Sequence, residues 1–197
     1  MKKILLAAWL CLPVAGWAYH QGPGQERLRL DRVDAALADA AQELQGGNHD
    51  AAVQGYELAL KELPADRVQE ARRIRLELAK LRMEHKQLPT AQRELSELVK
   101  ELSEDETASP ELLAEARRSY ANAQYYITYL MRLEGYTRED WEPQIEISRQ
   151  MYRLLAEQAD QVGDDALALA SREDLESTVR LARLDLQDLQ GLPLPNQ

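Results

Sequence analysis

The 197-residue chain has one cysteine, Cys11, and no phenylalanine, and its 34 acidic side chains outnumber its 24 basic ones. One thiol near the N-terminus can build neither an internal disulfide framework nor a cysteine-based zinc site. A formal net charge of −10 opposes general nucleic-acid binding, which needs a basic surface. His20, His49 and His85 stand at no metal-ligand spacing, and there is no HExxH motif. We therefore expect no metal, no cofactor and no nucleic-acid partner.

Motifs for catalysis are missing as well. The nine glycines are scattered, so they form neither a phosphate-binding loop nor a dinucleotide-binding fingerprint. The acidic run Glu104-Asp105-Glu106 lacks the ligand positions around a sharp turn that a calcium loop requires. No set of serine, histidine and aspartate residues rises above chance as a nucleophilic triad. The sequence predicts a protein that is not an enzyme and has no catalytic residues.

The first segment, Met1–Ala18, has the layout of a secretory signal peptide. Two lysines precede the apolar run Ile4–Val14, and the small residues Gly16 and Ala18 follow it at the spacing of a cleavage site. The run is interrupted by Pro13 and falls short of the ~20 apolar residues that span a bilayer. We expect cleavage after Ala18, export to the periplasm and no membrane span in the mature protein.

The remaining sequence predicts a single helical domain over residues 26–190, with a flexible lead-in at 19–25 and a flexible tail at 191–197. Ala, Leu, Glu, Arg and Gln dominate the domain, and no segment alternates apolar and polar residues as a half-buried strand does. Caps, glycines and prolines divide it into about seven helices. Their expected ranges are 26–45, 48–63, 65–86, 89–103, 109–135, 137–163 and a last helix that starts at either 164 or 172. The short loops between them make neighbouring helices antiparallel.

Two of these helices carry apolar or small residues at alternating steps of four and three. The predicted seam of the sixth helix is Trp141, Ile145, Ser148, Tyr152, Leu155, Ala159 and Val162. That of the seventh helix is Leu175, Val179, Ala182, Leu186 and Leu189. Such seams can pack on each other at a shallow crossing angle. The predicted fold class is therefore all-α, with antiparallel helical hairpins stacked as a short irregular solenoid.

A repeat lies within this pattern. A glycine turn, a small residue, an aromatic residue, a second small residue and a closing proline follow one another in its first copy. The residues are Gly47, His49, Ala52, Tyr56, Ala59 and Pro64. The frame returns 39 residues later at Leu88, Ala91, Leu95 and Leu98, and Ala40 and Ala79 share the small position of the preceding helices. A looser third copy contains Gly135, Ser148, Tyr152 and Leu155.

This pattern resembles the second half of a tetratricopeptide repeat. The small residues of such a repeat let its two helices approach closely, and its proline ends the unit. The resemblance implies a tetratricopeptide-like protein that binds a protein or peptide on a concave surface, and the signal peptide adds that it is exported from a bacterial cell. In the family, the first helix of each repeat lines that surface.

Tyrosine is concentrated in the expected helix 109–135. An apolar stripe of this helix must face the core. It consists of Leu112, Ala116, Tyr120, Ala123, Ile127 and Leu130. Tyr125 and Tyr129 lie off the stripe, so they either pack against a neighbouring hairpin or line a groove. Aligned on Gly135, the resemblance places Asn122, Tyr125 and Tyr129 on groove-facing positions, with Arg73 and Lys80 in the preceding repeat. The predicted partner-binding set is Arg73, Lys80, Arg118, Asn122, Tyr125, Tyr129 and Arg132.

A basic, aromatic strip in an acidic protein favours an acidic segment or a C-terminal carboxylate as its partner. The leading hypothesis is a non-catalytic periplasmic adaptor or assembly scaffold that holds another protein in its groove. The alternative is a helical-bundle holdase or structural protein that self-associates through its last helices. A third hypothesis is an auxiliary subunit of an envelope enzyme that contributes no catalytic group.

Overall fold

The computed structural model describes residues 23–185 and 188–189. The predicted signal peptide, the predicted tail and residues 19–22 of the predicted lead-in lie outside the described residues. The described part contains seven α-helices and no strand. They are α2 (Pro23–Gln45), α3 (His49–Glu62), α4 (Val68–Glu84), α5 (Leu88–Glu104), α6 (Pro110–Leu133), α7 (Arg138–Val162) and α8 (Asp165–Arg183). None of these helices is both long enough and apolar enough to cross a membrane.

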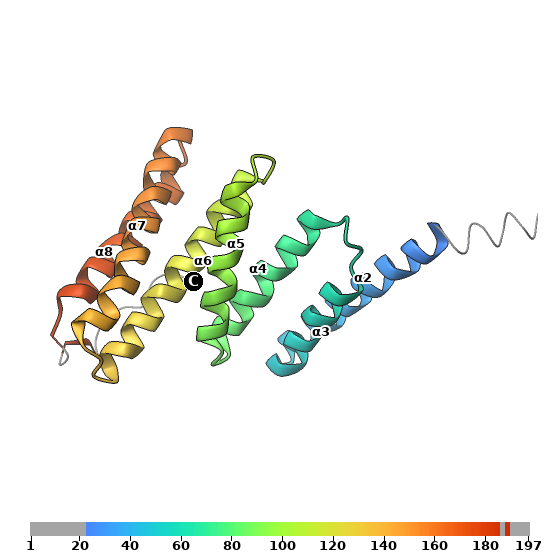
Figure 1. Ribbon diagram of the computed structural model, residues 1–197, viewed down its shortest axis with the longest axis horizontal. Helices are drawn as coiled ribbons and strands as arrows, with labels where there is room; N and C mark the ends of the chain where they lie inside the picture. Colours follow the sequence, from blue (N-terminus) through green and yellow to red (C-terminus); the bar gives the residue numbers. More distant parts are fainter. Residues whose placement is uncertain (1–22, 186–187, 190–197) are drawn as a thin grey trace, which may run out of the picture. The chain divides into compact units, whose positions relative to one another are not determined.

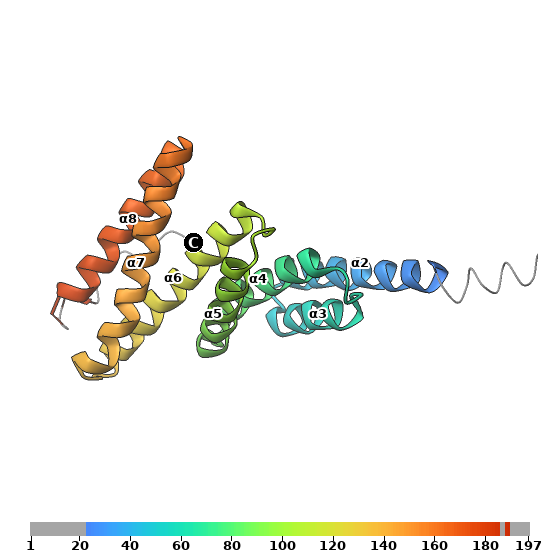
Figure 2. The same ribbon diagram turned by 45° about the horizontal axis from the view of Figure 1, so that its top comes forward.

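The structure confirms the predicted all-α fold of stacked antiparallel hairpins. Helix α2 packs on α3, α5 on α6, α6 on α7 and α7 on α8, each beside its neighbour in the chain (Figures 1 and 2). The chain divides into two compact units, the first ending at Ile74 and the second beginning at Arg75. Each unit is described below by itself. The second contains the end of α4 and all of α5 to α8.

Four helices end in the same kind of turn, in which one residue adopts a left-handed conformation. After α2, α6 and α7 this residue is Gly47, Gly135 or Gly163, with φ between 76° and 81°. In each turn the next backbone N–H donates to the carbonyl five residues earlier, which is the hydrogen bond of a Schellman motif. The turn after α4 makes this bond from Gln87 to Arg82 at 3.1 Å. Its left-handed residue is Lys86, at φ 61°, and not a glycine.

Side-chain caps fix the starts of three helices. The Ser109 hydroxyl accepts from the Leu112 N–H at 3.2 Å, and Thr137 and Asp140 form the predicted capping box of α7. The Asp164 carboxylate accepts from the Leu167 N–H at 3.0 Å. The last helix therefore starts at the earlier of its two predicted positions. Asn48 precedes α3, but its side chain does not cap the helix and instead donates to Glu43.

The core of the first unit depends on small residues where α2 meets α3. Ala40, Ala52 and Ala59 are almost fully buried, as the repeat pattern requires of its small positions. The two helices also approach each other closely at Gly55, which the pattern did not single out. A Cβ atom on Gly55 would lie only 2.7 Å from the Ala40 Cβ. The absence of a side chain at residue 55 therefore lets the two helices pack at this distance.

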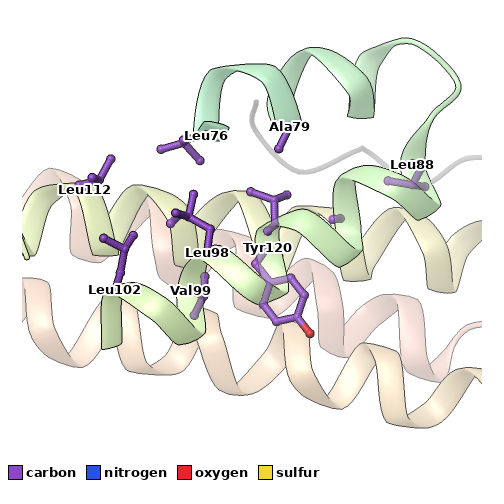
Figure 3. Packing of buried hydrophobic residues seen from close by; sticks show 11 residues of the cluster. Leu76, Ala79, Leu88, Leu98, Val99, Leu102, Leu112 and Tyr120 are labelled. Atoms are coloured by element: carbon purple, nitrogen blue, oxygen red, sulfur yellow. The ribbon is translucent and has the colours of Figure 1, made fainter. Parts of the chain in front are cut away.

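The second unit has two main hydrophobic clusters, and α6 contributes to both. One cluster joins Leu76 and Ala79 of α4 to leucines of α5 and to Leu112 and Tyr120 of α6 (Figure 3). The other cluster joins α6 to the last two helices. Its buried members are Tyr125, Trp141, Ile145, Leu181 and Leu189. Two faces of α6 are thus covered, which leaves a third face for the groove described below.

The predicted seam of α7 is buried from Trp141 to Ala159, whereas Val162 is 79% exposed. The predicted seam of α8 is displaced. Its buried face consists of Ala168, Ser171, Asp174, Thr178 and Leu181. Leu175, Val179 and Ala182 are only half-buried, and Leu186 lies outside the described residues. Leu189, which follows the helix, is buried as predicted. A polar face can be buried here in part because the Thr178 hydroxyl donates to the Leu175 carbonyl at 2.7 Å within the helix.

Candidate functional site

The second unit contains a groove of about 660 Å³ between the end of α4 and the third face of α6. Residues from α4, from the turn that follows it and from α6 line the groove. They are Lys80, Met83, Glu84, Lys86, Leu88, Glu115, Arg118, Ser119, Asn122, Tyr126, Tyr129 and Leu130. Three of these side chains are basic and two are acidic. The groove is thus slightly basic in a chain whose net charge is −10.

The pitch of α6 brings its polar and aromatic side chains to this groove. Glu115, Arg118, Asn122, Tyr126 and Tyr129 follow one another at steps of three and four residues, so they share one face of the helix. The other faces of α6 are in the two hydrophobic clusters. The side chains of the groove are therefore presented by a helix that is held on both flanks.

Lys80 links the two walls of the groove. Its Nζ donates to Glu115 Oε1 of α6 at 2.8 Å and to Glu77 Oε1 at 3.1 Å. Burial by itself lowers the pKa of Lys80, but the hydrogen bonds to Glu115 and Glu77 outweigh it, and the pKa is raised above its ordinary value. Lys80 is therefore charged at neutral pH, and its charge is already balanced by two carboxylates.

Arg118 differs from Lys80 in its hydrogen bonding. Its Nη2 atom is buried, and no group in the described part of the chain accepts a hydrogen bond from it. A guanidinium group carries five N–H donors and cannot lose its charge in a protein. A buried donor without an acceptor costs about 1–3 kcal/mol. An anion that comes into contact with this nitrogen would remove the cost.

A buried tyrosine of α7 fixes the side chain of Asn122 by a hydrogen bond. The Tyr152 hydroxyl donates to Asn122 Oδ1, and Tyr152 itself is fully buried. Burial raises the pKa of Tyr152 far above its ordinary value, and the Asp174 carboxylate raises it further. The phenol therefore keeps its proton and donates permanently. Because this bond occupies the carbonyl of Asn122, the amide N–H group is the part of the side chain left for other partners.

Four of the seven predicted partner-binding residues line the groove, namely Lys80, Arg118, Asn122 and Tyr129. Tyr125 does not line it. Its side chain is fully buried, and its ring packs edge-on against Tyr126 with 5.8 Å between centroids. Tyr125 thus belongs to the contact with a neighbouring hairpin, which was one of the two roles left open by the sequence.

Arg132 also serves the fold. Its guanidinium donates to the carbonyls of Leu181 and Leu184 at the end of α8 and lies 4.8 Å over the Trp141 ring. It therefore caps the last carbonyls of α8. Burial lowers the pKa of Arg132. Arg73 is exposed, lies in the first unit and is not among the residues that line the groove.

The predicted binding set lacks the other eight residues that line the groove, namely Met83, Glu84, Lys86, Leu88, Glu115, Ser119, Tyr126 and Leu130. Leu130 was expected in the core, yet it is 45% exposed. For Lys86 the sequence did contain a signal. In the repeat frame, Leu88 stands where His49 stood in the first copy, so Lys86 takes the place of Gly47. A lysine at a glycine position of the frame indicates a side chain on a backbone conformation that glycine adopts more easily.

No group of three or more histidine, cysteine, aspartate or glutamate side chains within residues 23–185 and 188–189 is arranged to hold a metal ion. No protein-family model matches the chain, and no curated protein matches its sequence.

Proposed function

We propose that this protein is a non-catalytic interaction protein, an adaptor or assembly scaffold, that binds a segment of a partner protein in the groove between α4 and α6. The segment carries a carboxylate, as an acidic side chain or at a C-terminus, next to a large apolar side chain. One observation carries the proposal. Arg118 lines the groove among tyrosine and aliphatic side chains, and its buried Nη2 atom has no hydrogen-bond acceptor within the described residues.

The chemistry of the groove matches such a segment. A carboxylate would give Arg118 a charge-assisted hydrogen bond, which is about twice as strong as a neutral one. Asn122 offers an amide N–H group to the backbone or to a second carboxylate oxygen. Met83, Leu88 and Tyr126 line the groove and can bury an apolar side chain. Tyrosine and arginine together are the composition typical of interface hot spots.

The setting of the groove supports a peptide ligand. About 660 Å³ can hold a few side chains, which is the scale of a short linear segment. The groove is formed by α4 and α6, which would be the first helices of successive repeats in the tetratricopeptide-like interpretation. What supports that interpretation is the burial of Ala52, Ala59 and Ala91 together with the recurring turns at the helix ends.

We also propose that the protein acts after export to the periplasm. The support is the arrangement of lysines, apolar run and small residues in Met1–Ala18. The intact mass of the exported protein tests this part. A mass that begins at Tyr19 supports it, and a mass that retains Cys11 contradicts it.

The alternative function, self-association through the last helices, needs a free seam on α7. Trp141, Ile145, Tyr152 and Leu155 are instead buried within the chain's own fold. A second copy could reach them only after α7 separates from its neighbours. We therefore favour the groove as the binding surface.

Selection from a random heptapeptide library on the immobilised full chain tests the proposal. The enriched peptides should combine Asp or Glu with large apolar residues. Arg118→Gln should abolish the enrichment, because glutamine offers no charge to a carboxylate. The control is Arg153→Gln, which changes an exposed arginine of α7 that pairs with Glu157 at the surface. Peptides that bind Arg118→Gln equally well, or no enrichment over an empty matrix, would refute the proposed function.

A further inference from the structure

The turn after α4 differs from the other helix-ending turns because a residue with a side chain adopts the left-handed conformation, which strains the backbone. Gly47, Gly135 and Gly163 take the left-handed position in three turns, and Lys86 takes it in the fourth. All four turns make the same hydrogen bond between residues five apart. Left-handed backbone is free of strain for glycine, whereas a side chain with a Cβ brings that atom too close to the carbonyl oxygen. Asparagine and aspartate tolerate this region better than lysine does.

Nothing in the geometry of the turn requires a side chain at residue 86. The other three turns close equally well with glycine, so a glycine here would relieve strain and keep the hydrogen bond. The Lys86 side chain therefore makes no contribution that the turn itself needs. Strained backbone of this kind concentrates at sites where a particular side chain must be presented.

The position of Lys86 places the positive charge of its side chain at the groove. Lys86 is exposed and lines the groove together with Arg118. Lys80, the other lysine there, is already paired with Glu77 and Glu115. Lys86 thus adds an exposed positive charge to a groove that also contains Arg118, whose Nη2 is buried without an acceptor within the described residues.

We propose that Lys86 determines the specificity of the groove for acidic segments, by placing its ammonium group against a carboxylate of the bound peptide. This inference rests on the proposed function and deepens it. Arg118 holds one carboxylate inside the groove, and Lys86 contacts a second one at its rim. A ligand with two acidic residues is therefore preferred over a ligand with one.

The decisive variant is Lys86→Gly, because stability and binding should change in opposite directions. The melting temperature should rise by about 2–4 °C as the left-handed strain is relieved. The affinity for a fluorescein-labelled acidic peptide from the library selection, measured by anisotropy, should fall about 5- to 10-fold. Its dependence on salt should become weaker. Lys86→Arg keeps the charge and should retain most of the affinity.

Two controls separate the possible failures. Gly163→Lys places a lysine in the equivalent turn after α7, and it should lower the melting temperature without changing peptide affinity. The same peptide with Gln and Asn in place of its acidic residues should bind the parent and Lys86→Gly alike.

Unchanged affinity of Lys86→Gly would overturn the role of Lys86, while a loss of binding in Arg118→Gln would leave the proposed function standing. A lower melting temperature of Lys86→Gly would overturn the strain argument. A chain whose binding survives both substitutions would contradict the proposed function as well.

Discussion

Replacement of Gly55 by alanine tests the closest helix contact of the first unit. In an exposed helix interior, glycine to alanine stabilises a protein by about 1 kcal/mol, because alanine has the higher helix propensity. Gly55 lies inside α3, so propensity alone predicts a more stable variant. The structure predicts the opposite sign. The new Cβ would lie 2.7 Å from the Ala40 Cβ and 3.2 Å from the Ala36 carbonyl oxygen.

The magnitude follows from how far the helices must separate. Carbon atoms in favourable contact are about 3.5–4.0 Å apart, so α2 and α3 would have to move apart by roughly 1 Å at this point. The obstacles are a Cβ and backbone atoms of α2, which cannot rotate away as the end of a long side chain can. Overpacking of this kind costs about 1–3 kcal/mol. After subtraction of the propensity gain, we expect Gly55→Ala to destabilise the first unit by up to about 2 kcal/mol.

Urea denaturation followed by circular dichroism measures this change in the free energy of unfolding. Gln54→Ala is the matched control, because Gln54 is exposed on the same helix and its replacement should have little effect. The double variant Ala40→Gly with Gly55→Ala moves the methyl group from one helix to the other. It should recover part of the stability relative to the sum of the single variants. A Gly55→Ala variant that is more stable than the parent would refute the close approach of α2 and α3.

Two further predictions concern buried tyrosines of the second unit. Burial raises the pKa of Tyr125 to about 12, so the unfolded chain loses this proton from about pH 10 while the native state keeps it. Stability should fall between pH 10 and 12, and Tyr125→Phe should make that fall shallower in denaturation curves measured across this range. Tyr152→Phe removes the hydrogen bond to Asn122 and should both lower stability by about 1–3 kcal/mol and weaken peptide binding in the anisotropy assay. Tyr125→Phe is its control and should bind peptide as the parent does, since no group in the described part of the chain bonds its hydroxyl. Equal peptide affinity of both variants would contradict a role of Tyr152 in holding Asn122.

Local signals predicted most of the fold. The box of Thr137 and Asp140 and the glycines after the helices report on backbone conformation within a few residues of themselves. Such signals need no knowledge of distant parts of the chain. The predicted all-α hairpin order and the buried small residues of the repeat were correct for this reason.

The candidate site was harder to predict, because it depends on which residues cover each face of α6. Tyr125 and Tyr126 are one residue apart, so about 100° of helix rotation separates a fully buried ring from one that lines the groove. Tyrosine is compatible with both environments. Arg132 looked like a surface charge, and its acceptors are the carbonyls of Leu181 and Leu184, about fifty residues away. No pattern inside α6 indicates that these carbonyls need a donor.

The prediction of the buried face of α8 was wrong for a related reason. Hydrophobicity placed its seam on Leu175 and Val179, but the buried positions are Ser171, Asp174 and Thr178. A pattern based on apolar residues cannot find a polar face whose hydroxyl is satisfied inside its own helix, as that of Thr178 is. The same limit applies to the hydrogen bond between Tyr152 and Asn122, which joins two helices through polar atoms.

The features of the groove that cost free energy point to binding. Arg118 keeps a buried nitrogen without an acceptor, and Lys86 keeps a left-handed backbone that three other turns assign to glycine. Neither feature by itself indicates a binding site. Both line one groove, however, and an anionic ligand would make use of both at once. Neither Lys86 nor Arg118 is a member of the two hydrophobic clusters of α6. The left-handed backbone of Lys86 and the buried Nη2 of Arg118 without an acceptor, both at one slightly basic groove, are the physical support for the acidic partner that we propose.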